Sequence, residues 1–176
     1  MLDFATLYGS HARDVYRFAL LLCGDPALAD DIAAETFVRA WSARERVDLG
    51  SVKAYLFAIA RNLFLHEIRR PARRTAPLDA NVSSTEPSPE RRAAARDDLR
   101  AVLAELQQLP EVDRAALAMR IEDQMPYEEI ARILELSVSA AKVKVHRARL
   151  RLAQARARRP ENETWDPKTE CDPKTE

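Results

Sequence analysis

Apolar residues recur every three or four positions along most of this chain, and this feature restricts the fold more than any other. One such run extends from Phe4 to Leu22, a second from Leu28 to Trp41 and a third from Val52 to Leu63. This spacing places apolar side chains on one face of an α-helix, whereas a half-buried strand would alternate apolar and polar residues. No strand-like alternation of useful length occurs and glycine appears only three times, so we predict an all-α fold.

Proline and glycine predict where the helices end. Gly24 stops the first helix, and Asp25-Pro26 starts the second with a capping carboxylate and a proline in the first turn. The polar stretch 44–51 lacks periodicity and is expected to be a loop. The third helix should end at Arg70, because Pro71 cannot continue it.

The composition then divides the chain into two parts. Residues 71–90 are rich in proline, serine and threonine and poor in large apolar residues, which is typical of a linker. Helical spacing returns at Leu99. We therefore expect two small helical domains, residues 1–70 and 96–158, joined by a flexible linker (71–95) and followed by an acidic disordered tail (159–176).

The second domain contains a helix-turn-helix pattern, in which the second helix enters a DNA major groove. It consists of a short helix from Tyr127 to Leu134, a three-residue turn and a longer helix that begins at Val138. No acidic residue occurs from Val138 to Arg159, and one side of the long helix is apolar. A solvated basic face on an ordinary helix is the simpler alternative, but the turn and the apolar stripe together favour DNA binding.

Both halves contain motifs of one known family. The second half carries Leu109-Pro110, Arg114, Tyr127-Glu128-Glu129-Ile130-Ala131, Ser137-Val138 and Lys142 with His146-Arg147-Ala148-Arg149. The first half carries Val15-Tyr16-Arg17-Phe18-Ala19, Asp30-Asp31-Ile32, Glu35-Thr36-Phe37-Val38-Arg39-Ala40-Trp41 and Ala54 to Asn62. These blocks resemble regions 4 and 2 of the extracytoplasmic-function (ECF) sigma factors, a compact class of the bacterial sigma-70 family. The resemblance covers about residues 3–70 and 98–155, and two blocks in the right order make it highly specific.

The resemblance implies a sigma factor, which binds core RNA polymerase and directs promoter recognition and open-complex formation. The residues that would contact the upstream promoter element are Ser137, Ser139, Lys142, Val143, Lys144, His146, Arg147 and Arg149. Those that would contact the melted element are Arg46, Asp48, Ser51, Arg61, Asn62, Arg69 and Arg70. Those that would dock on the polymerase are Asp30, Asp31, Glu35 and Thr36. An inhibitory anti-sigma factor is a further implied partner.

Simpler explanations exist for single residues in these sets. The acidic residues of the second helix would stabilise its N-terminal end in any protein, and the arginines near residue 70 would stabilise a helix C-terminus. The chain also departs from the family pattern, with Glu135 at a turn position that is usually glycine, Pro126 in place of a capping serine, and Ala140 in place of a threonine. If Glu135 adopts a left-handed conformation, it costs about 1 kcal/mol more than glycine would. Other departures are Ala34, Val52 and Tyr55.

Other functions and locations find less support. No glycine-rich phosphate loop or nucleophile–base pairing is evident, and the three histidines lack metal-ligand spacing, so no catalytic residue, cofactor or metal is expected. The main alternative is a one-component helix-turn-helix regulator that binds duplex DNA without polymerase, but the acidic docking helix argues against it. Cys23 is expected to be a packing residue. Without an apolar run of membrane-spanning length or a signal-peptide pattern, we expect a cytoplasmic protein with no membrane insertion.

The last segment raises a separate hypothesis. Residues 160–176 contain six acidic residues and two lysines, and the motif DPKTE occurs twice. This acidic tail is expected to shield the basic recognition helix when polymerase is absent.

Overall fold

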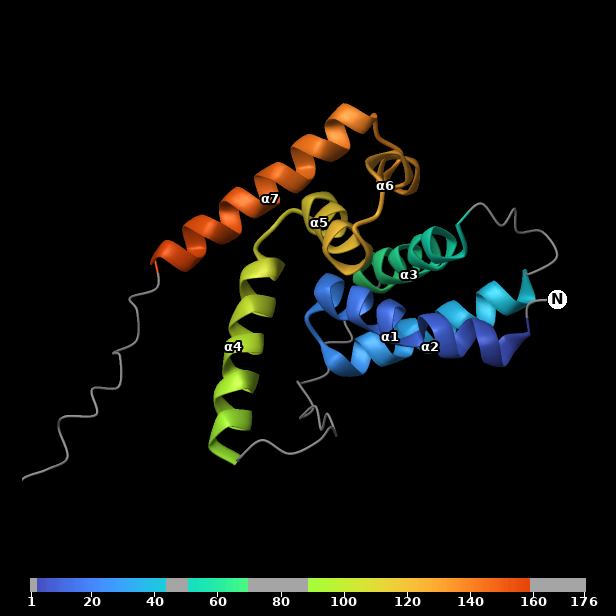
Figure 1. Ribbon diagram of the computed structural model, residues 1–176, viewed down its shortest axis with the longest axis horizontal. Helices are drawn as coiled ribbons and strands as arrows, with labels where there is room; N and C mark the ends of the chain where they lie inside the picture. Colours follow the sequence, from blue (N-terminus) through green and yellow to red (C-terminus); the bar gives the residue numbers. More distant parts are fainter. Residues whose placement is uncertain (1–2, 44–50, 70–88, 159–176) are drawn as a thin grey trace, which may run out of the picture.

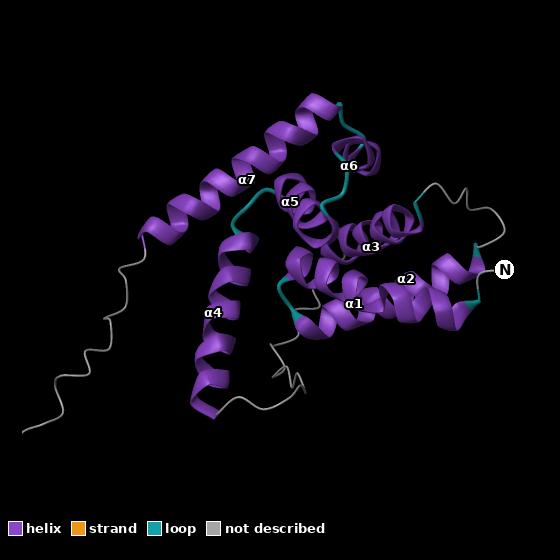
Figure 2. Cartoon of the chain, in the orientation of Figure 1, coloured by secondary structure: helices purple, strands orange, loops and turns teal. Residues whose placement is uncertain are grey.

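The structure is a computed structural model that describes residues 3–43, 51–69 and 89–158 of the 176-residue chain. All regular secondary structure in these ranges is helical (Figure 2). The predicted all-α fold is confirmed. Residues 44–50 of the expected loop, residue 70, residues 71–88 of the expected linker and the tail 159–176 lie outside the described residues.

The described residues of the N-terminal half form a bundle of three helices, α1 (Phe4–Cys23), α2 (Pro26–Ser42) and α3 (Val52–Arg69) (Figure 1). Gly24 ends α1 with a left-handed φ of 72°, and the Asp25 carboxylate accepts a hydrogen bond from the Ala27 backbone N–H (2.9 Å) to start α2. The rings of Phe18 and Phe57 stack in the bundle core with centroids 4.3 Å apart. The predicted end of the first helix at Gly24 and start of the second at Pro26 are thus confirmed.

Residues 89–158 of the C-terminal half form four helices, α4 (Pro89–Gln107), α5 (Glu111–Asp123), α6 (Tyr127–Leu134) and α7 (Val138–Arg158). α4 begins inside the segment 71–95 that was expected to be linker, because Pro89 suits the first turn of a helix. α6, the turn and α7 form the helix-turn-helix. The apolar side of α7, with Ala141, Val145 and Ala148 buried, packs on α5 and α6.

The turn between α6 and α7 depends on a residue in the left-handed region. Glu135 has φ 56° and ψ 45°, and it closes α6 as its C-cap. The next N–H, of Leu136, donates to the Ala131 carbonyl at 2.8 Å. This geometry, usual for glycine after a helix, is the condition under which the sequence predicted a cost for glutamate.

The two halves pack against each other instead of lying apart. α5 lies across α1, α4 also contacts α1, and α6 contacts α3 (Figure 1). The buried apolar residues of both halves form one continuous cluster. This packing was not anticipated from the sequence, and it determines which candidate residues are accessible.

Candidate DNA-binding and polymerase-docking surfaces

The recognition helix α7 presents a basic face to solvent. Seven of the eight predicted upstream-element residues are exposed, namely Ser137, Ser139, Lys142, Val143, His146, Arg147 and Arg149. Val143, 46% exposed, is the apolar member of this face. Lysine and arginine at these positions can contact phosphates or guanine edges, and valine can contact a thymine methyl group.

Serine residues at the start of α7 combine capping with exposure. The Ser137 hydroxyl accepts a hydrogen bond from the Ala140 N–H (3.2 Å) and lies 3.0 Å from the exposed Ser139 hydroxyl. The unsatisfied N–H groups at a helix N-terminus favour an anion such as a phosphate. Ser137 and Ser139 therefore lie at the N-terminal end of α7, where the free N–H groups would favour a DNA phosphate.

Lys144 differs from the other basic residues of α7. Its ammonium nitrogen lies 3.1 Å from the Asp113 Oδ1, and the side chains are 29% and 3% exposed. Asp113 belongs to α5, on which α7 packs. Lys144 thus lies on the packed side of the helix, where it joins α7 to α5 and does not share the exposed basic face.

The ring of Tyr127 lies close to two cationic side chains near the start of the helix-turn-helix. The Arg120 guanidinium lies 4.9 Å from the centroid of the Tyr127 ring, and the Lys142 ammonium lies 5.7 Å from it. Cations at these distances are attracted to the face of an aromatic ring. Lys142 is exposed, and its ammonium group also has a defined neighbour on the protein, the Tyr127 ring.

On α3, the candidate residues for melted DNA fall into different environments. Asn62 and Arg69 are exposed. The Ser51 hydroxyl accepts a hydrogen bond from the Ala54 N–H (3.2 Å), which places it at the start of α3. Arg61 is 14% exposed and donates two hydrogen bonds to Glu111 of α5, from Nε at 2.9 Å and from a terminal nitrogen at 3.0 Å. Arg46, Asp48 and Arg70 lie outside the described residues.

The acidic face of α2 carries three of the four candidate docking residues. Asp30, Asp31 and Glu35 are exposed, and Glu35 accepts a hydrogen bond from Arg39 at 2.7 Å. Thr36 is fully buried, and its hydroxyl donates to the Ile32 carbonyl at 2.7 Å. The expectation that Thr36 belongs to the docking surface needs correction, since its hydroxyl is satisfied within the helix and its side chain lies in the core.

Contacts that the sequence analysis did not predict hold the two halves together. The side chain of Glu122 on α5 is 4% exposed, and it pairs with Arg17 of α1 at 3.1 Å. Burial raises the pKa of the Glu122 carboxyl, and Arg17 offsets part of that rise. Gln107 donates a hydrogen bond to the Leu21 carbonyl (3.4 Å) and lies against Gly24, where an added Cβ would come within 3.0 Å of its side chain.

Arg114 has a related role at the junction of α4, α5 and α3. One of its terminal nitrogens donates to the carbonyls of Leu106 and Gln107 at 3.4 and 3.3 Å, which satisfies the C-terminal end of α4. Its guanidinium also lies 5.6 Å from the centroid of the Phe64 ring. The motif Leu109-Pro110 with Arg114 marked this residue in the sequence, but not its contact with α3.

Cys23 behaves as a packing residue, as predicted. Its thiol is partly buried and donates to the Asp25 carbonyl at 3.2 Å. Burial raises the pKa of the Cys23 thiol to about 11, so the reactive thiolate is scarce at neutral pH.

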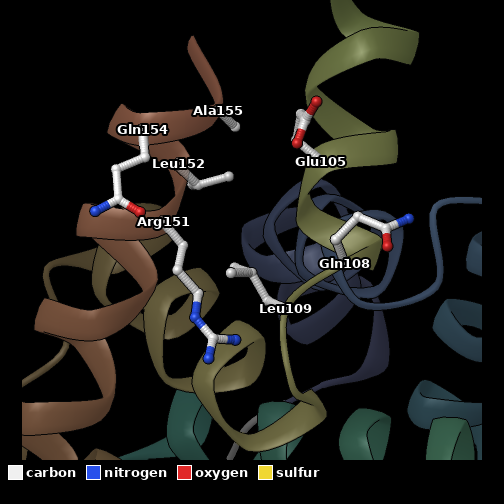
Figure 3. Close-up of a pocket in the computed structure, with 7 residues that line it drawn as sticks. All are labelled: Glu105, Gln108, Leu109, Arg151, Leu152, Gln154 and Ala155. Atoms are coloured by element: carbon white, nitrogen blue, oxygen red, sulfur yellow. The ribbon is translucent and has the colours of Figure 1, made fainter. Parts of the chain in front are cut away.

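A cleft of about 340 Å³ opens between α4 and the C-terminal half of α7 (Figure 3). Its walls combine apolar and polar side chains, namely Glu105, Gln108, Leu109, Arg151, Leu152, Gln154 and Ala155. It lies further along α7 than the predicted DNA-contacting residues, which end at Arg149. Within the described residues, no cluster of three or more histidine, cysteine or acidic side chains is arranged to hold a metal ion.

Comparison with known proteins agrees with the division of the chain into two regions in this order. The sequence model for Sigma-70 region 2 matches residues 7–75, and that for Sigma-70 region 4 matches residues 99–152. The ECF RNA polymerase sigma factor SigM of Bacillus subtilis is 31% identical over 132 residues, which cover 74% of this chain and 81% of SigM. The ECF sigma factor SigE of Mycolicibacterium smegmatis is 32% identical over 149 residues, covering 80% of this chain and 56% of SigE.

A solved structure is also similar to this chain. It is the sigma factor RpoE in complex with the anti-sigma factor NepR from Bartonella quintana, with a TM-score of 0.68 and 25% sequence identity. The similarity covers 89% of this chain and 99% of that one. The correspondence therefore extends over both helical halves and not over a helix-turn-helix alone.

Proposed function

Because this chain belongs to the ECF group of the bacterial sigma-70 family, we propose that it binds core RNA polymerase and directs it to a particular set of promoters. The observation that carries the proposal is the pair of matches to region 2 and region 4, in that order, on α1–α3 and α4–α7. The exposed basic face of α7 provides the chemistry that duplex recognition requires.

The C-terminal half is proposed to recognise the upstream promoter element. Lys142, Arg147 and Arg149 share the exposed face of α7 and would contact phosphates or guanine edges, with Val143 against a thymine methyl. Phosphate contacts release counterions from DNA, so each one makes the affinity more sensitive to salt.

The N-terminal half is proposed to bind the melted element. Asn62 can read a base edge, and Arg69 can hold the backbone of an unpaired strand. Such a protein breaks no bond: it binds melted DNA more tightly than duplex DNA, and that difference in free energy shifts the promoter toward the open state. We therefore propose a transcription initiation factor without enzymatic activity of its own.

The exposed acidic face of α2, with Asp30, Asp31 and Glu35, is proposed to dock on a basic surface of the polymerase. Complementary charge at such an interface determines orientation and the rate of association more than affinity. The neighbouring Arg39 lowers the net charge near Glu35, so the two aspartates are expected to dominate the electrostatic attraction.

We also propose an anti-sigma partner and a cytoplasmic site of action. The similar RpoE structure contains the anti-sigma factor NepR, and the same kind of partner would control access to the two DNA-binding halves here. No described helix is long and apolar enough to cross a membrane. A one-component regulator acting without polymerase is not favoured, since region 2 of the sigma-70 family matches residues 7–75.

Transcription in a defined system tests the function. The purified chain would be mixed with core RNA polymerase and a genomic DNA library, and the transcripts would be sequenced. Discrete start sites that share two upstream motifs and are absent without the protein are expected. Protection of duplex DNA by the chain alone, with no effect on the polymerase, would instead identify a one-component regulator.

A further inference from the structure

The cleft between α4 and the C-terminal half of α7 combines an apolar wall with polar side chains (Figure 3). Leu152 points from α7 toward α4, and Leu109, which follows α4, lines the other side. Glu105 and Gln108 carry oxygen atoms that can accept a hydrogen bond, and Arg151 adds a cation. Such a site fits an aromatic ring that carries one N–H donor, which is the chemistry of a tryptophan side chain.

The size of the cleft suits one inserted side chain. Its volume of about 340 Å³ is at the lower end of the range of roughly 300–1,000 Å³ that is usual for small-ligand sites. A stable interface between folded proteins places about 20–30 residues on each side, far more than the few that line this cleft. The cleft therefore fits a side chain with its short flanking segment better than it fits a folded partner.

The chain itself contains a matching segment close to the cleft. Residues 159–176 include a single aromatic residue, Trp165. α7 ends at Arg158, and the seven residues from there to Trp165 span up to about 24 Å. Leu152 and Ala155 of the cleft lie within two helical turns of that end, at most about 9 Å along the axis. Trp165 can thus reach the cleft of its own molecule.

Charge favours the same placement. Residues 160–176 carry six acidic residues and two lysines, and the carboxylates of Glu163 and Asp166 stand on either side of Trp165 in the sequence. No acidic residue occurs in α7. The exposed arginines of its C-terminal half are Arg147, Arg149, Arg151 and Arg156. Arg151 lines the cleft, so it can pair with a carboxylate next to an inserted Trp165.

We propose that Trp165 inserts into the cleft between α4 and α7 of the same molecule and anchors the acidic segment 160–176 along the basic side of α7. The inference goes beyond the proposed function and does not depend on it. Insertion into a second copy of the chain, and attraction by charge without insertion, are the alternatives that the experiments separate.

The anchor brings the rest of the segment within reach of the exposed basic face. The eleven residues after Trp165 include four acidic ones, and they span up to about 37 Å. Along α7, Ala155 of the cleft is only about 12 Å from Arg147. An inserted Trp165 therefore holds these carboxylates at a high local concentration beside the predicted DNA-contacting residues.

Fluorescence of Trp165 in the full chain tests the insertion. W41F removes the other tryptophan and keeps an aromatic ring next to Phe4. In this background A155Q enlarges a side chain that lines the cleft, and A153Q makes the same change at an exposed position of α7 outside it. A tethered anchor has an effective concentration in the mM range and is mostly bound, so A155Q should raise the acrylamide quenching constant about threefold. Equal quenching constants in A155Q and A153Q would overturn the proposal.

Two conditions separate the alternatives without any change in the cleft. Between 0.1 M and 1 M salt the Debye length falls from about 10 Å to about 3 Å, and protection of Trp165 from quenching should persist if the ring is inserted. Protection that disappears at 1 M salt refutes the anchor. The protection should also be equal at about 1 µM and about 100 µM protein, because the contact is intramolecular. Protection seen only at the higher concentration would place the segment on a second copy and contradict the proposal.

Duplex DNA binding by the free chain separates an anchored segment from one that acts by charge alone. W165A leaves every charge of the segment in place, and it should tighten binding at low salt by about threefold, close to the gain from deleting residues 160–176. Unchanged binding by W165A beside a clear gain from the deletion would exclude the anchoring role of Trp165. None of these measurements uses RNA polymerase, so their outcome is independent of the proposed function.

Discussion

Replacing Lys144 tests whether this residue positions α7 or contacts DNA. Its ammonium lies 3.1 Å from Asp113, whose side chain is 3% exposed. K144M would leave that carboxylate buried without its partner. Breaking a fully buried pair costs about 3–5 kcal/mol, and the partial exposure of Lys144 reduces the expected loss to about 2 kcal/mol. For a chain of this size, that loss lowers the melting temperature by about 4–8 °C.

The matched variant is K142M on the exposed face of the same helix. It should change the free energy of unfolding by no more than about 0.5 kcal/mol. If Lys142 contacts a phosphate, K142M should also flatten the log-log dependence of DNA affinity on salt by about 0.9. K144M should leave that slope unchanged, because an ammonium paired with Asp113 releases no counterion from DNA.

Two measurements decide between the roles: thermal unfolding followed by circular dichroism, and duplex binding titrated at several salt concentrations. The double variant D113N/K144M should recover much of the stability lost in K144M, since the buried charge is removed together with its partner. A K144M protein with unchanged melting temperature and a flatter salt dependence would refute the positioning role and place Lys144 at a phosphate.

Three other predictions follow from the turn, the packed halves and the tail. E135G should raise the free energy of unfolding by about 1 kcal/mol, because glycine adopts the observed φ of 56° without strain; denaturant unfolding measures this, and a loss of stability would contradict it. Burial raises the pKa of Glu122 above its ordinary value of 4.5, so the packed halves bind a proton at Glu122 more tightly than the separated halves do. The packed arrangement is therefore weakened as pH rises through that raised pKa. Energy transfer between dyes on the two halves should therefore increase on acidification from pH 7 toward 5, and E122Q should reduce this change; an identical pH response in E122Q would show that another group is responsible. Deleting residues 160–176 should increase DNA binding by the free chain at low salt, where charges are least screened, and unchanged binding would exclude shielding by the tail.

The helices and the exposed basic face could be predicted from local patterns. Gly24, Pro26 and Pro126 act within a turn of their own position, so their effect on helix ends is visible in the sequence. The orientation of Lys144 was also available from spacing, since it lies three residues after Ala141 and four before Ala148, both fully buried. This orientation was not predicted, because basic residues occur on all sides of α7 and Lys144 was assigned to the DNA-contacting set by its residue type and not by its position on the helix.

The contacts between the halves had no comparable local signal. Arg61 and Glu111 are 50 positions apart, and each has an ordinary explanation alone, as a helix-surface cation and as a first-turn acid. Thr36 is also ambiguous by type, because a threonine can be buried when its hydroxyl bonds to the carbonyl one turn earlier, as it does with Ile32. Such pairings depend on which surfaces meet, and periodicity does not encode that choice.

The ring of Tyr127 has a consequence for how the overall affinity for promoters can change during evolution. It lies 5.7 Å from the Lys142 ammonium, so it restricts that long side chain before DNA arrives and lowers the entropy lost on binding. Substitution of Tyr127 by a smaller residue would release the lysine without altering any side chain that meets a base. Affinity could thus drift across all promoters together through a position in the supporting helix, while the choice among promoters remained with the exposed face of α7.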